Sequence, residues 1–253
     1  MGREIIEVLA QFGGGIGDPG NNAVRFLLAA FFWGVLAWVS GKKFKESLEK
    51  RDSYICVAAL IGLSREVIMF FLEYGSHRGF FPALFSYRTF PPLEHALTDI
   101  CRSILGGAYL YYFLENKKTG YRLAAIGSAA FILLYLITAP LWIKFLDQNA
   151  DPQNIAVTEF AYFWGDMAFR VVASTLLAAV IFFLAARKGK DKKVPAALYV
   201  GIFFLFLDEF LMLVNIAAGF QEYRWIFSPL RHNLGIWAIP LFLAAYWSDI
   251  VKE

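Results

Sequence analysis

The sequence predicts an all-α integral membrane protein, a bundle of seven transmembrane helices with its amino terminus outside and its carboxyl terminus in the cytoplasm. Hydrophobic residues make up 58% of the 253 residues and charged residues only 18%, a composition typical of integral membrane proteins. Mean hydropathy is +0.52, and seven apolar segments approach or exceed the roughly 20 residues that span the hydrocarbon core. We therefore expect a multi-pass protein of the inner or plasma membrane.

The chain is predicted to have two parts. Residues 1–22 read as a short amphipathic segment followed by a Gly-rich link, because Glu4 and Glu7 interrupt the apolar run and glycines follow it. Residues 23–253 form the predicted seven-helix membrane domain. Its apolar segments lie at about residues 23–40, 53–74, 92–113, 123–145, 159–186, 194–218 and 230–251.

Basic residues concentrate in every second connection between these segments. The clusters are Lys42, Lys43, Lys45, Lys50 and Arg51; Lys117, Lys118 and Arg122; and Arg187, Lys188, Lys190, Lys192 and Lys193. Because cytoplasmic loops carry an excess of Lys and Arg, these connections are expected in the cytoplasm. The net charge of +3 is small and shared among short clusters, which disfavours nucleic acid as a partner. The expected partner is the lipid bilayer.

We select twelve ionisable residues in or at the edge of the apolar segments as candidates for a site. They are Arg65, Glu66, Glu94, His95, Asp99, Arg102, Asp166, Arg170, Asp208, Glu209, Arg231 and His232. At a rise of about 1.5 Å per helical residue, all of them fall in the outer half of the predicted bundle. Ionisable groups at membrane depth are costly and by default mark functional sites. We therefore predict one outward-facing polar cavity that binds a small ligand or ion.

The segment at residues 92–113 is the predicted centre of this cavity. His95, Asp99 and Arg102 are spaced i, i+4 and i+7, which places them on one face of a helix. Gly106 continues the same stripe, and a small residue there allows a neighbouring helix to approach closely. The other segments are expected to form the wall around this helix.

Three other interpretations of the charged residues remain open. One is a set of ion pairs that only fixes helix packing; Asp166 and Arg170 at i and i+4 have the spacing of an internal salt bridge. Another is a divalent metal bound by His95, Asp99 and His232, as in a hydrolase-like membrane metalloenzyme. The third is a b-type haem held between histidines. No multi-histidine metal motif is present, which disfavours the metalloenzyme. We expect a binding module rather than catalytic activity in this chain.

Three stretches resemble the amino-terminal membrane region of bacterial sensor histidine kinases, in which a multi-helix unit precedes PAS and kinase domains. They are RFLLAAFFWGVLAW at residues 25–38, SREVIMFFLE at 64–73 and FPPLEHALTD at 90–99. The resemblance implies an input module for signal transduction. Because the chain ends at Glu253 without kinase segments, we expect a cytoplasmic signalling partner, a following output domain or a homodimer to complete the signalling unit.

Overall fold

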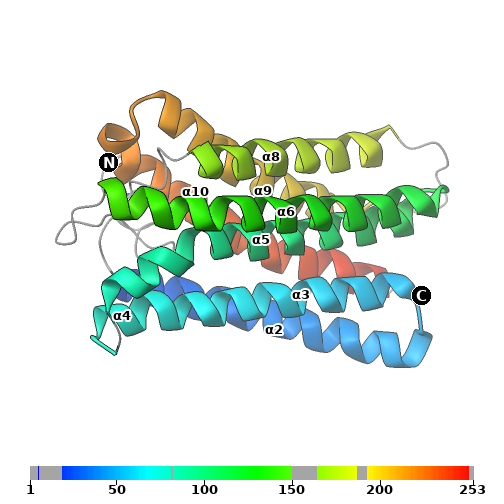
Figure 1. Cartoon of the computed structure of the whole chain (residues 1–253). Coiled ribbons are helices and arrows are strands. Elements are labelled where there is room, and N and C mark those ends of the chain that lie inside the picture. Colours follow the sequence, from blue (N-terminus) through cyan, green and yellow to red (C-terminus); the bar gives the residue numbers. More distant parts are fainter. Residues whose placement is uncertain (1–4, 6–18, 81, 150–163, 187–192, 251–253) are drawn as a thin grey trace.

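The computed structural model describes residue 5 and residues 19–80, 82–149, 164–186 and 193–250. These residues form helices and no strand, which confirms the predicted all-α class. Within these ranges the chain folds into seven helices of 20 to 33 residues (Figure 1). They are α2 (Pro19–Ser47), α3 (Lys50–Met69), α5 (Ala83–Phe113), α6 (Lys117–Asn149), α8 (Trp164–Ala185), α9 (Ala196–Ala217) and α10 (Phe220–Ile250), with a π-helical turn η1 (Phe70–Tyr74) and a short helix α4 (Gly75–His77) after α3.

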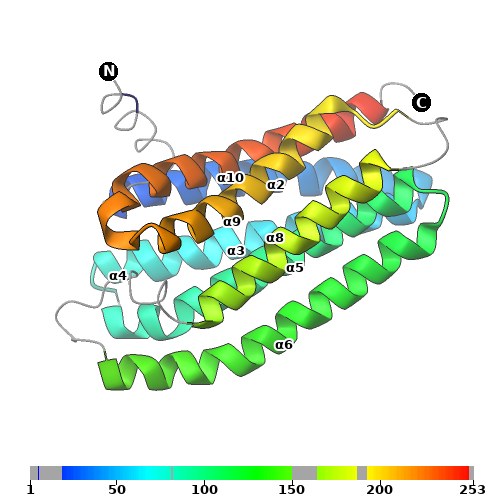
Figure 2. The same cartoon turned by 90° about the horizontal axis from the view of Figure 1, so that it is seen from above.

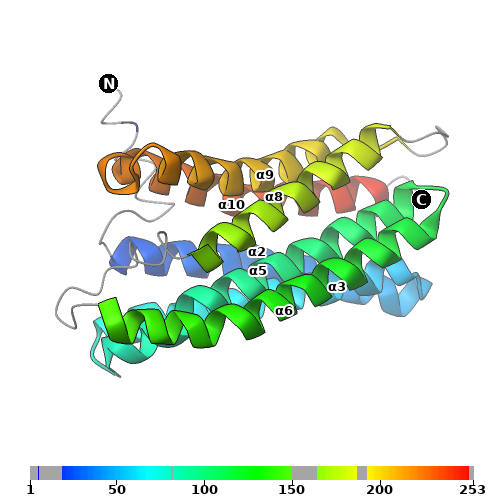
Figure 3. The same cartoon turned by 45° about the horizontal axis from the view of Figure 1, so that its top comes forward.

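Successive long helices run in opposite directions, so that α2, α5, α8 and α10 begin at the end of the bundle where α3, α6 and α9 finish (Figures 1 and 2). We call this the polar end, and the other the opposite end. Six helices contact one another in a closed ring, in the order α2, α3, α5, α8, α9 and α10. The seventh, α6, packs outside this ring against α5 and α8 (Figures 2 and 3).

Five helical stretches of the described residues are long and apolar enough to cross a membrane. They are Ala23–Ser47, Lys50–Tyr74, Lys117–Gln148, Trp164–Ala185 and Ala196–Ala217. The outer surface of α6 is apolar, with Ile126, Leu133 and Leu136 all exposed. Soluble proteins rarely expose contiguous apolar surface of this kind, and it matches the apolar interior of a bilayer. The structure thus supports a membrane protein with at least these five spanning helices.

The largest differences from the predicted helix starts are in two helices. α5 starts at Ala83 rather than near residue 92, and α10 starts at Phe220 rather than near residue 230. A proline lies at the first predicted start and directly before the second, at Pro92 and Pro229. A proline inside a helix removes one main-chain hydrogen bond, a loss that bundled helices tolerate. α10 accordingly continues through Pro229.

The predicted amino-terminal boundary and first connection also change. α2 begins at Pro19, inside the predicted link, and runs to Ser47 through Lys42, Lys43 and Lys45. Lysine is a good helix former and is favourable near a helix carboxyl end, so these cations extend the helix beyond the apolar segment. The predicted amphipathic segment, apart from residue 5, and residues 159–163 of the predicted fifth segment lie outside the described residues.

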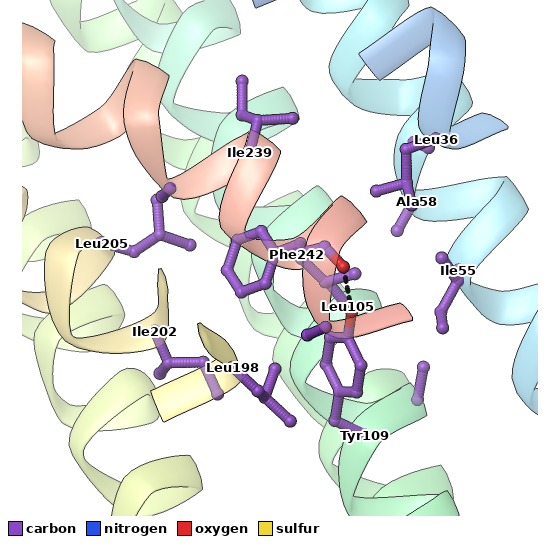
Figure 4. Close-up of a cluster of buried hydrophobic side chains, with 14 of the residues drawn as sticks. Leu36, Ile55, Ala58, Leu105, Tyr109, Leu198, Ile202, Leu205, Ile239 and Phe242 are labelled. Atoms are coloured by element: carbon purple, nitrogen blue, oxygen red, sulfur yellow. Dashed lines mark hydrogen bonds between the residues drawn. The ribbon is translucent and has the colours of Figure 1, made fainter. Parts of the chain in front are cut away.

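An apolar core fills the half of the ring toward the opposite end (Figure 4). Leu36, Leu105, Leu198 and Phe242, from four different helices, are each at most 2% exposed. The hydroxyl of Tyr109 reaches the carbonyl oxygen of Phe242 at 3.5 Å. Burial of these side chains packs the ring firmly at this end, and the polar side chains gather in the other half.

Two glycines set the approach of α5 to α6. A Cβ at Gly107 would lie 2.6 Å from Ala124 Cβ, and a Cβ at Gly120 would overlap the backbone of Tyr111. We expect Gly120→Ala to lower the midpoint of thermal unfolding in detergent, because overpacking of this kind costs about 1 to 3 kcal/mol. Gly34→Ala is the control, since a Cβ there would meet nothing within 4 Å. Equal midpoints for the two variants would contradict the close approach.

Candidate functional site

All twelve ionisable residues singled out in the sequence lie at the polar end, where the ion pairs of the four arginines and His95 join eleven of them, all except His232, in two groups across five helices. Arg102 on α5 is the centre of this network. It donates to Asp99 Oδ1 at 3.1 Å and to Asp208 Oδ2 at 2.7 Å, and it also pairs with Glu209. The Arg102 side chain is 7% exposed and that of Asp99 only 1%. One buried guanidinium thus joins α5 to two adjacent carboxylates of α9.

Arg170 extends the network to α8. Its Nε donates to Asp166 Oδ2 at 2.9 Å, and its Nη1 donates to Glu209 Oε2 at 3.0 Å. The other oxygen of Asp166 lies 3.0 Å from His95 Nε2 on α5. The Asp166–Arg170 pair is therefore more than an internal salt bridge of one helix, because Arg170 shares Glu209 with Arg102.

Arg231 connects α10 to the same network. Its Nε donates to Asp208 Oδ1 at 3.1 Å, so Asp208 links Arg231 to Arg102. Its Nη1 lies 3.3 Å from the sulfur of Met212, which is a weak acceptor. Part of this guanidinium therefore retains the capacity to bind a stronger acceptor.

A smaller group of charges joins α3 to α5. Arg65 donates to Glu66 Oε1 at 2.6 Å and also pairs with Glu94. The Glu66 side chain is 6% exposed. Its second oxygen, Oε2, has no hydrogen-bond partner among the described residues. A buried carboxylate oxygen without a donor is costly, so this atom is a candidate contact for a ligand or a water molecule.

These groups surround a cavity of about 110 Å³ at the polar end. Since a water molecule occupies about 30 Å³ in the liquid, the cavity has room for a few waters or one small solute. Nine of the twelve predicted residues line it: Arg65, Glu66, Glu94, His95, Arg102, Asp208, Glu209, Arg231 and His232. The structure places Asp99, Asp166 and Arg170 behind this wall, where they hold the lining residues.

Glycines keep this space open. A Cβ at Gly62 on α3 would lie 2.7 Å from the indole ring of Trp33 on α2, so the glycine lets the ring lie against α3 as part of the wall. Gly235 lines the cavity from α10, and a Cβ there would point toward Asp208 at 3.6 Å from Oδ2. A larger residue at position 235 would occupy the space beside Asp208.

Sequence reasoning missed Arg25 and Thr98, which also line the cavity. Arg25 is 8% exposed, and its guanidinium packs over the Phe26 ring at 4.4 Å. A cation at the start of an apolar segment is typical of the membrane surface, so the sequence alone gave it no role in the site. Thr98 lies beside Asp99 in the segment predicted as the centre, and its small polar side chain gave no separate signal.

The structure does not bring the proposed metal ligands together. His95 contacts Asp166 and Asp99 contacts Arg102, and only His95 and His232 of the three line the cavity. Among the described residues, no group of three or more His, Cys, Asp or Glu is arranged to hold a metal ion. The described donors therefore do not fit a metal centre. A volume of about 110 Å³ is below the roughly 300 to 1,000 Å³ of typical cofactor pockets, so the space does not fit a haem.

A second polar group, centred on the buried side chains of Arg51 and Asp52, lies near the opposite end and was not indicated by the sequence. We call it the opposite-end cluster: Ser47, Arg51, Asp52, Tyr112 and Tyr246. Asp52 is 0% exposed and accepts from Arg51 Nε at 2.9 Å, Ser47 Oγ at 3.0 Å and Tyr246 OH at 2.9 Å. The Arg51 guanidinium lies 3.9 Å from the centre of the Tyr112 ring. Arg51, predicted as a loop cation, instead ties α3 to α5 and α10.

No protein-family model, curated protein or solved structure matches this chain. The resemblance to the membrane region of sensor histidine kinases therefore remains a prediction from the sequence.

Proposed function

We propose that the chain is a membrane-embedded receptor-like module that binds one small polar solute in the cavity at the polar end. The observation that carries this proposal is the placement of the charges. Nine ionisable side chains from α3, α5, α9 and α10 converge on one solute-sized space. Ion pairs that served only to fix helix packing would need no space between them, because buried polar groups are normally satisfied by direct contact.

The proposal includes seven spanning helices and the predicted orientation. α5 and α10 are the two long helices outside the five apolar stretches, and each contributes charged or titratable residues of its first half to the cavity lining. Charged side chains inside a membrane face the bundle interior or a water-filled space. The charged residues of α5 and α10 are therefore compatible with helices that span the membrane. With the basic connections in the cytoplasm, the polar end faces outward and the solute arrives from outside.

The arrangement also offers a route for signalling. α10 carries Arg231 and His232 at the cavity and Tyr246 near the opposite end, where it binds Asp52 on α3. Pro240 lies between them, inside the helix, and prolines are common sites of helix bending. A solute that draws Arg231 away from Asp208 would shift α10 and thereby the opposite-end cluster. A cytoplasmic partner, or a second copy of the chain, is the proposed receiver.

Solute-induced thermal stabilisation tests this function. Purified protein in detergent is heated with glycine, acetate, methylammonium or acetamide at equal ionic strength, and at least one solute is expected to raise the unfolding midpoint. Gly235→Leu places a side chain in the cavity and should remove the shift. Gly34→Leu is the matched control, because position 34 has open space around it. If no solute raised the unfolding midpoint, or if the increase persisted in Gly235→Leu, the cavity would not be a binding site.

A further inference from the structure

We propose that the solute is a small zwitterion of the amino-acid type, whose carboxylate binds Arg25 and whose ammonium group binds Glu66. This inference rests on the proposed function and names the ligand class of the same cavity. Three observations carry it: a buried guanidinium without a direct ion pair and a buried carboxylate oxygen without a donor, both judged among the described residues, and a balance of charges in the cavity lining.

Arg25 is the first of these. Its side chain lines the cavity and is 8% exposed, and its guanidinium packs over the Phe26 ring. Its charge interacts electrostatically with Glu73 most strongly and also with Glu94 and Glu66, but among the described residues it forms no direct ion pair, and its Nε has no hydrogen-bond partner. A guanidinium carries five N–H donors, and a buried donor without a hydrogen-bond acceptor is costly. Of the acids near Arg25, Glu66 and Glu94 are paired directly with Arg65, and Glu73 acts on it without a direct ion pair. An anionic oxygen group in the cavity would supply the missing partner.

Glu66 provides the complementary group. Its Oε1 is bound by Arg65, whereas Oε2 lacks a donor among the described residues, and Glu66 is 5% exposed in the wall of the same cavity. An ionised carboxylate accepts hydrogen bonds through both oxygens. An ammonium group, with its three donors, fits this free oxygen. Arg25 on α2 and Glu66 on α3 would thus bind opposite ends of one molecule.

The charges of the lining favour a ligand without net charge. Four arginines (Arg25, Arg65, Arg102 and Arg231) and four carboxylates (Glu66, Glu94, Asp208 and Glu209) line the cavity, so their formal charges cancel. A simple anion or cation would leave the buried site with an uncompensated charge, which is costly in a low-dielectric environment. A zwitterion satisfies both free groups and keeps the balance. The volume of about 110 Å³ favours a small molecule such as glycine or alanine.

The test compares solutes that carry one or both charged groups. Glycine and alanine should raise the unfolding midpoint of the wild-type protein far more than acetate, methylammonium or acetamide at equal ionic strength. Arg25→Gln and Glu66→Gln should each weaken glycine binding by about tenfold or more, the usual effect of losing a charge-assisted hydrogen bond. The controls are Arg122→Gln and Glu115→Gln, which make the same changes at exposed positions and should leave glycine binding unchanged.

The outcomes separate this inference from the proposed function. Stabilisation by acetate equal to that by glycine and insensitive to Glu66→Gln would show an anion site. Stabilisation by methylammonium insensitive to Arg25→Gln would show a cation site. Either result overturns the zwitterion and leaves the binding cavity standing. If none of these solutes shifted the unfolding midpoint, both the zwitterion and the binding cavity would be overturned. The comparison of solutes on the wild-type protein decides this outcome, so the test does not depend on a variant that fails to fold.

Discussion

Arg102→Gln is expected to reduce the free energy of unfolding by about 3 to 5 kcal/mol, the usual cost of removing one partner from a buried ion pair. The substitution leaves Glu209 with Arg170 and Asp208 with Arg231. Asp99 is different, because its side chain is 1% exposed and Arg102 is its only described ion-pair partner. The loss should therefore come mainly from a buried carboxylate that has lost its counter-charge. It is measured by unfolding titration in mixed micelles.

A second substitution checks this explanation. Asp99→Asn in the Arg102→Gln background removes the uncompensated charge and should recover part of the lost stability, a coupling that a double-mutant cycle quantifies. Arg122→Gln on the exposed surface of α6 is the matched control and should change stability by less than about 0.5 kcal/mol. If Arg102→Gln were no more destabilising than Arg122→Gln, Arg102 would not be the centre of the polar end.

The grouping of the charges could be predicted from the sequence because depth in an antiparallel bundle follows from counting residues. Asp99 lies after the start of its helix and Asp208 before the end of its own, and those two helix ends meet at the polar end. Counting residues to estimate depth requires only the lengths of the helices and the rule that successive helices run in opposite directions. Both follow from the positions of the apolar segments. The predicted grouping also remains valid despite the errors in helix boundaries. α5 and α10 are longer at their polar ends than predicted, but the order of the charged residues along each helix is the same.

The pairings could not be predicted in the same way, because they depend on rotations of the helices about their axes. The sequence suggested that His95, Asp99 and Arg102 share one face, yet the structure directs His95 to Asp166 on α8 and Arg102 to α9. Arg25 was missed for a related reason. Arg25 lies near a predicted membrane surface. That position does not tell whether its side chain points to water or to the interior of the helix ring.

Arg51 and Asp52 show the same limit at the opposite end. In the sequence they follow Lys50 in a basic connection, where solvent exposure is the usual expectation. In the structure both side chains are at most 1% exposed, since Tyr112 and Tyr246 reach them from α5 and α10. The contact between α3 and α5 therefore has polar groups at each end, Arg65 with Glu94 at the polar end and Arg51 with Tyr112 at the opposite end. The apolar core lies between them.

Asp52→Ala is expected to destabilise the protein nearly as much as Arg102→Gln, by about 3 to 5 kcal/mol. The substitution removes the acceptor for Arg51, Ser47 and Tyr246 together and deprives a buried guanidinium of its closest described carboxylate. Tyr246→Phe removes one of these hydrogen bonds while the ring can stay packed, so its expected cost is only about 0.5 to 1.5 kcal/mol. Both costs are measured by unfolding titration in mixed micelles.

The comparison of these two variants also tests the signalling route. Glu115→Ala, an exposed acid on the connection between α5 and α6, is the control for loss of a carboxylate and should be nearly neutral. Tyr246→Phe should leave the solute-induced thermal shift intact, because position 246 does not line the cavity, while reducing the response of a cytoplasmic partner. Should Asp52→Ala prove as mild as Glu115→Ala, the opposite-end cluster does not hold α3 to α10, and the proposed route along α10 fails with it.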